Sequence, residues 1–118
     1  MTGVPAYPQH LHKALQPASG DPAWSELQRS MVSMHEAFSS LKATGNNDED
    51  FVELMLPHHQ AAIDMAKAEL THGQDPQMRR LAQEIITDKE SEIELMQLWL
   101  KQQDAQKSKS ATSAVKGQ

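Results

Sequence analysis

The sequence predicts an all-α protein, and three features support that fold class. Apolar residues recur at helical spacing in three long segments, and no segment sustains the alternation typical of a β-strand. Two of the segments open with the same pair, Asp21-Pro22 and Asp75-Pro76, which suits an N-cap Asp followed by Pro at the first helical position. The length of 118 residues fits one domain. Because short connections make neighbouring helices antiparallel, we expect an up-down antiparallel helical bundle.

The first long helix is predicted over residues 22–44, with Gly45 as its stop. Its apolar stripe consists of Trp24, Leu27, Met31, Met34, Phe38 and Leu41. The second is predicted over residues 48–72 and ends at Gly73. It begins with three acidic residues, which the positive end of the helix dipole favours. Its apolar stripe consists of Phe51, Met55, His58, Ala62, Met65 and Ala66.

The third long helix is predicted over residues 76–103. Its apolar stripe consists of Met78, Leu81, Ala82, Ile85, Ile93, Met96, Trp99 and Leu100. The bundle domain then spans residues 21–103, between an N-terminal arm at 1–20 and a tail at 104–118 that lacks apolar periodicity and is predicted to be disordered. Residues 8–15 of the arm can form a short helix. Either the three long helices pack alone with that segment as a partial fourth, or two chains pair.

The composition argues against several classes of protein. The formal net charge is −5, and no cluster of Lys or Arg is available to bind nucleic acid. No apolar run approaches the roughly 20 residues of a membrane-spanning helix. The lack of Cys removes disulfides, thiolate catalysis and Cys-type metal sites. The sequence contains no hydrolase or phosphate-loop motif, and we expect a protein that is not an enzyme.

Several residues interrupt the predicted apolar stripes. His58 lies at the centre of the second stripe and His59 at its edge, directly after Pro57, which is expected to bend that helix. On the third helix, Lys89 and Glu92 fall on the apolar stripe. Because burying an unpaired charge is costly, we expect these residues to be paired with an opposite charge, exposed to solvent or part of a functional site.

The spacing of these residues describes a candidate metal site. Residues three and four apart are neighbours on a helix, so Met55 can converge with His58 and His59, and Glu92 with Met96. The first helix adds three residues at similar spacing: Met31, Met34 and His35. Thioether and imidazole ligands together suit a soft ion such as Cu(I), and by analogy Ag(I). Imidazole with carboxylate suits Cu(II) or Zn(II).

Each feature also has a purely structural interpretation. Met and single His residues at helical spacing are commonly part of a core, and Lys89 with Glu92 can form an ion pair. Met-rich helix faces also suit a structural module that dimerises without metal. A ferritin-like di-metal oxidase is a weaker alternative, because it uses two Glu-x-x-His motifs and this chain has one, at residues 69–72.

The stretch FVELMLPHHQAAIDMA, residues 51–66, closely resembles the signature of a bacterial family named domain of unknown function 305. Three later segments match it as well: Leu81-Ala82-x-x-Ile85-Ile86, Glu92-Ile93-x-x-Met96 and Trp99-Leu100. The resemblance covers about residues 48–101, and the double His with its flanking Met residues is its most specific part.

The resemblance implies a ferritin-like all-α bundle, generally exported to the periplasm or the cell surface. Some relatives, a copper-resistance protein among them, bind copper or silver through Met and His. Carried over to this sequence, the implied ligands are Met55, His58, His59, Met65, Glu92 and Met96, and Met31 and Met34 resemble Met residues of the preceding helix in other members. One departure is Lys89, where members commonly have Gln; this cation can pair with Glu92 and withdraw it from a metal.

We therefore expect a periplasmic or otherwise extracytoplasmic protein that sequesters or carries copper. Its expected partners are the metal ion and copper-handling proteins, and the chain can also pair with a second copy of itself as a homodimer. Met and His are suitable ligands where Cys would be oxidised. Residues 1–5 lack the basic and apolar regions of a signal peptide, so this location requires a mature or shortened chain. A cytoplasmic protein is the alternative.

Overall fold

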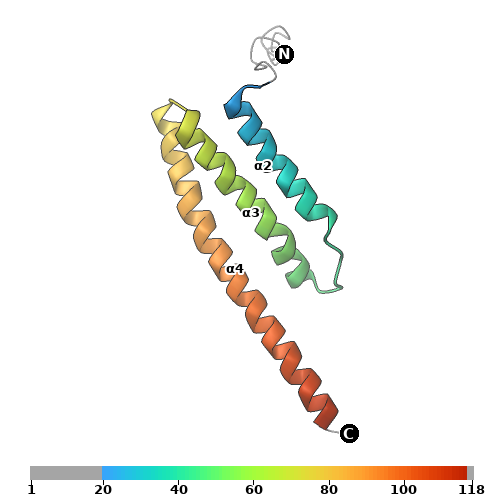
Figure 1. The fold of residues 1–118 in the computed structure, drawn as a ribbon. Helices are drawn as coiled ribbons and strands as arrows, with labels where there is room; N and C mark the ends of the chain where they lie inside the picture. The colour runs from blue at the N-terminus through green and yellow to red at the C-terminus, as the bar shows by residue number, and fades with distance from the viewer. Residues whose placement is uncertain (1–19, 117–118) are drawn as a thin grey trace, which may run out of the picture.

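The computed structural model describes residues 20–116, and in that range it contains three α-helices and no strand (Figure 1). The helices are α2 (Pro22–Ser39), α3 (Asn47–His72) and α4 (Pro76–Lys116). The predicted all-α bundle is confirmed. The short helix predicted over residues 8–15 lies outside the described residues.

Each helix begins where the sequence supplies a capping side chain. The carboxylates of Asp21 and Asp75 each accept two backbone N–H groups of the following turn at 2.9–3.1 Å. The Asn46 side chain accepts one, from Glu49, at 3.1 Å. These bonds satisfy donors that have no partner within the helix, so local chemistry fixes all three starting points.

The first connection begins earlier than predicted, because α2 ends at Ser39 and not near Thr44. The hydroxyl groups of Ser39 and Ser40 donate to backbone carbonyls three residues back, an alternative to continued helix. Thr44 then donates to the Asp50 carboxylate from both its backbone N–H (3.0 Å) and its hydroxyl (2.8 Å). Gly45, at φ +88°, supplies the left-handed turn between them.

The second difference concerns the C-terminal segment, since α4 continues to Lys116 (Figure 1). The prediction of a disordered tail is therefore wrong for residues 104–116. Ala, Gln and Lys are good helix formers, so this segment favours helix without an apolar stripe. The Lys107 ammonium also pairs with the carboxylate of Glu49, at the start of α3. That ion pair joins the extension of α4 to the rest of the bundle.

The bundle is an open layer with α3 in the middle. α3 packs against α2 on one side and α4 on the other (Figure 1). Among the described residues, no Cα of α2 lies within 8 Å of a Cα of α4, so the outer helices do not close over α3. The layer therefore has two broad faces.

The core between these helices is thin. Its buried apolar residues are mostly small: Val52, Ala61, Ile63, Ala66, Ala68 and Ala82. No large side chain in the described range is fully buried. Many large apolar residues stay substantially exposed: Trp24, Met31, Val32, Phe51, Leu54, Met65, Met78, Leu81, Leu95, Leu98 and Val115. None of the three described helices combines the length and apolar character that a membrane crossing demands.

Candidate metal centre

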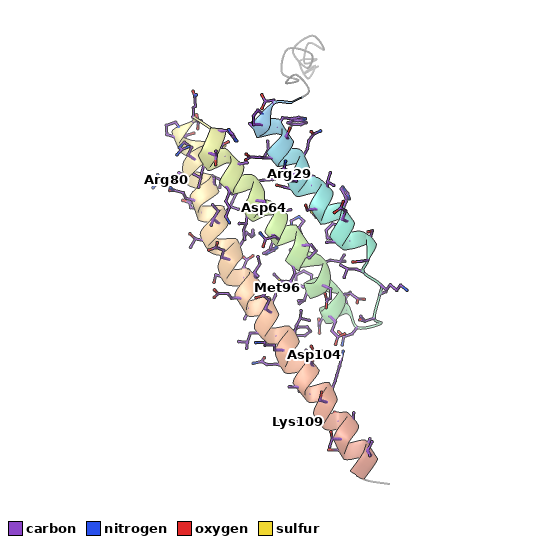
Figure 2. All side chains as sticks on the ribbon, viewed as in Figure 1. Arg29, Asp64, Arg80, Met96, Asp104 and Lys109 are labelled. Carbon is purple, nitrogen blue, oxygen red and sulfur yellow. The ribbon has the colours of Figure 1, made fainter. Side chains whose placement is uncertain are left out.

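The two faces of the layer differ in chemistry, as the surroundings of Ser30 on α2 show. Ser30 is buried against α3 and lines a gap there with Arg29, Asp64 and Lys67. Figure 2 shows Arg29 and Asp64 on the two helices that border this gap. Met31, one residue after Ser30, lies about 100° round the helix on the side opposite Arg29. We call the side with Arg29 and Asp64 the polar face, and the side with Met31 the open face.

His58 of α3 belongs to the open face. Its neighbour His59 is buried against α4, so Gln60 and His58 lie about 100° from it on opposite sides. Gln60 donates a hydrogen bond of 3.0 Å to a carboxylate of the polar face. His58 is therefore on the open face, in line with the residues seven positions away on either side, Phe51 and Met65.

Three further candidates lie on α2: Met31, Met34 and His35. A hydrogen bond of 3.1 Å between Nε2 of His72 on α3 and Oε1 of Glu26 on α2 marks the antiparallel register of these helices. The candidates lie about two turns further along α2 from Glu26, which makes them level with Met65 and its neighbours. Met55 is nearer the other end of α3 and does not join this group.

The structure brings together His59, Glu92 and Lys89 across the contact between α3 and α4. Nε2 of His59 is hydrogen-bonded to Oε2 of Glu92, and Nζ of Lys89 lies 3.3 Å from the same oxygen. His59 is 4% exposed, whereas Glu92 is exposed. The hydrogen bond from His59, and after it the one from Lys89, lowers the pKa of Glu92 below its ordinary value. The ion pair suggested by the sequence is thus present.

The second ring nitrogen of His59, Nδ1, differs from Nε2 in its surroundings. Nδ1 is buried and makes no hydrogen bond in the described part of the chain. When Nε2–H donates to Glu92, Nδ1 keeps its lone pair free. A histidine that binds a metal through one nitrogen usually donates its other N–H to a carboxylate or carbonyl in this way. In such an arrangement Glu92 orients His59 and is one step removed from the ion.

Met55 and Met96 lie close to this pair along the helices. The antiparallel contact of His59 with Glu92 makes Met55, one turn earlier on α3, level with Met96, one turn later on α4. Figure 2 labels Met96 beside the contact between α3 and α4. Met96 lines an apolar groove of about 310 Å³ there, whose other residues are Asp48, Phe51, Val52, Leu95 and Trp99.

The predicted ligands therefore fall into two groups. The first, at the contact between α3 and α4, contains Met55, His59, Glu92 and Met96. The second, on the open face of α2 and α3, contains Met31, Met34, His35, His58 and Met65. Within residues 20–116, no three His, Cys, Asp or Glu side chains lie close enough together to hold a metal ion. Both groups also contain methionine sulfur, a further side-chain donor for a soft metal ion.

Fold and site together define a class of protein: a small all-α bundle that exposes an apolar face rich in Met and His. The chain belongs to the family described as domain of unknown function (DUF305), whose model matches residues 7–116. No curated protein matches the sequence.

Proposed function

We propose that this protein binds copper, Cu(I) in preference, and sequesters or carries it outside the cytoplasm. The observation that carries the proposal is Nδ1 of His59, which is buried and makes no hydrogen bond within residues 20–116, while Nε2 of the same ring is hydrogen-bonded to Glu92. A buried polar atom without a hydrogen-bond partner calls for an explanation, and a bound metal ion is one of the standard ones. The orientation by a carboxylate favours a metal ion.

The donor set favours a soft ion. Met55 lies one turn from His59 on the same helix, and Met96 is level with it on α4. Thioether sulfur with neutral imidazole suits Cu(I), whereas Zn(II) and Cu(II) are better served by additional imidazole or carboxylate ligands. Ag(I) resembles Cu(I) in these preferences and serves as a redox-stable probe.

Sequestration or transport requires binding with ligand exchange and no chemical turnover. His58 is exposed, and its ring centroid lies 6.1 Å from that of His59. An ion can therefore meet His58 from solvent and pass to His59 on the same helix. The proposal includes copper-handling proteins that receive the ion. It also includes an extracytoplasmic location, where Cys ligands would be oxidised to disulfides.

The proposal is tested by native mass spectrometry of the protein titrated with Cu(I), Ag(I) and Zn(II). We expect a saturable Cu(I) or Ag(I) adduct that is lost in the double variant His58→Ala/His59→Ala. The matched control is His72→Ala, which removes a histidine paired with Glu26 at the end of α3. Far-UV circular dichroism checks that helical content is retained.

Two outcomes would contradict the proposal. Unchanged Ag(I) affinity in the double variant would remove the His pair from the site. The absence of any specific adduct in the wild type would make both histidines structural and favour a metal-independent interaction module. The ferritin-like oxidase is separated from both by iron titration with measurement of oxygen uptake.

A further inference from the structure

The open face of α3 is apolar along about four turns. From Phe51 to Met65, its side chains are Phe51, Leu54, His58, Ala62 and Met65, with no Asp, Glu, Lys or Arg among them. Phe51 is 58% exposed and Met65 37% exposed. Folded monomers rarely leave a contiguous apolar patch of this kind uncovered, so the face is a candidate interface.

The arrangement of this surface is self-complementary. Phe51, His58 and Met65 follow one another at intervals of seven residues along one side of α3. When two copies of α3 lie antiparallel about a two-fold axis at His58, Phe51 of each copy meets the partner's Met65. Contacts between methionine sulfur and aromatic rings are favourable, and the two imidazoles meet at the axis.

A partner for this face has to match the length of α3. That helix has 26 residues and is about 39 Å long at 1.5 Å per residue. A second copy of the chain, with an equal and matching face, is long enough.

The available area also fits a pair of chains. Six large apolar side chains on the open face are about half exposed: Met31, Phe51, Leu54, Met65, Leu81 and Leu95. A fully buried Leu, Met or Phe side chain removes roughly 60–120 Å² of apolar area from water, so these half-exposed side chains supply on the order of 500 Å² from two copies. A specific interface buries at least about 1,000 Å² in total, and a little over half of that area is apolar, so the supply is sufficient for a small interface.

We propose that two copies of this chain pair through their open faces about a two-fold axis near His58. The pairing closes each open layer and places one His58 from each copy in a shared pair of imidazoles. Assigning a soft metal ion to that pair rests on the proposed function, whereas the pairing itself does not.

The first experiment measures the oligomeric state of the full chain in EDTA by sedimentation equilibrium. We expect a dimer at about 100 µM, well above the micromolar dissociation constant of a small interface. Phe51→Glu should raise that constant at least 100-fold, because the two-fold axis introduces the charge twice. The matched control is Val32→Glu on α2: Val32 is also exposed, at 54%, but points away from α3, and its variant should still pair.

The second experiment tests the position of the axis. The chain has no Cys, so His58→Cys introduces a single thiol into each copy. Oxidation in EDTA should produce a covalent dimer from His58→Cys much faster than from Val32→Cys. Equal rates for the two variants would overturn the proposed axis.

If the wild type is a monomer at this concentration in EDTA, the proposed pairing is wrong, whether or not the protein binds Ag(I). Ag(I) titration of the same samples reads the proposed function separately. Silver binding by a monomer would refute the pairing and keep the function, and pairing without silver binding would do the reverse.

Discussion

Ile63 is the most deeply buried of the apolar core residues in the described range. It is 2% exposed and lies one turn after His59, on the same side of α3. Ile63→Ala removes three carbon atoms from this position. At about 0.8 kcal/mol per buried CH₂, the transfer contribution alone is about 2.4 kcal/mol, and the residual cavity raises the expected cost to about 3–4 kcal/mol.

The measurement is urea unfolding followed by far-UV circular dichroism, at one fixed protein concentration and in EDTA. Small domains have unfolding free energies of about 5–15 kcal/mol, so the midpoint should fall clearly. In thermal unfolding, the same loss corresponds to roughly 15–25 °C. The Ag(I) affinity of the folded variant should also fall, because Ile63 supports the turn that positions His59.

The control is Val32→Ala, which also shortens a β-branched residue. Val32 is 54% exposed, so its truncation should change the unfolding free energy by no more than about 0.5 kcal/mol. A cost below about 1 kcal/mol for Ile63→Ala would refute the reasoning. It would mean that α3 and α4 do not pack at this height and that His59 is not held by the contact.

Three further predictions concern charged side chains. Lys89→Gln is expected to raise the Ag(I) affinity about tenfold, because it removes a cation 3.3 Å from the carboxylate that orients His59. Competition titration measures this affinity, and a weaker affinity in the variant would contradict the prediction. The pKa of Glu92 is lowered from 4.5, so the carboxylate stabilises the fold fully above pH 4.5 and this contribution is lost as the pH falls through the folded-state pKa. Urea unfolding between about pH 6 and 3 should therefore show that the free energy of unfolding declines less steeply in Glu92→Gln than in the wild type. Glu49 raises the pKa of Lys107, and Lys107→Ala should abolish hydrogen-exchange protection of the last turns of α4, whereas unchanged protection would show that the ion pair does not hold them.

The helices could be predicted from the sequence largely because their starting points are local. Asp21, Asn46 and Asp75 each bond to N–H groups within three residues, so no tertiary information is needed to place them. The end of α4 cannot be predicted in this way. Residues 104–116 lack an apolar stripe, and their helix depends on propensity and on the partner that Lys107 finds far away in the sequence.

The candidate site could be predicted in composition but not in geometry. The spacing of Met55, His58 and His59 identifies the turn of α3 that carries the ligands. The contact of His59 with Glu92 spans 33 positions and depends on the register of two helices, which spacing within one helix does not determine. The same limit applies to the open layer, because an amphipathic stripe shows which side of a helix is apolar and not what covers it.

Pairing and metal binding, if they share His58, must be coupled, and this coupling gives a last prediction. A ligand that binds the dimer more tightly than the monomer shifts the equilibrium toward the dimer by its differential affinity. Linkage then requires Ag(I) to tighten pairing by the same factor by which pairing tightens Ag(I) binding. Sedimentation with and without Ag(I), and Ag(I) titration below and above the dimer dissociation constant, measure the two factors independently.

If Ag(I) tightens pairing and pairing tightens Ag(I) binding by the same factor, well above one, the ion lies in the pair of His58 imidazoles. Factors of one would place it within a single chain, at His59 with Met55 and Met96, where pairing leaves the ligands unchanged. His58→Ala separates these cases again: it should remove the coupling while leaving the site at His59 able to bind. The open face and the contact between α3 and α4 would then have separate tasks, the first in assembly and the second in holding the ion.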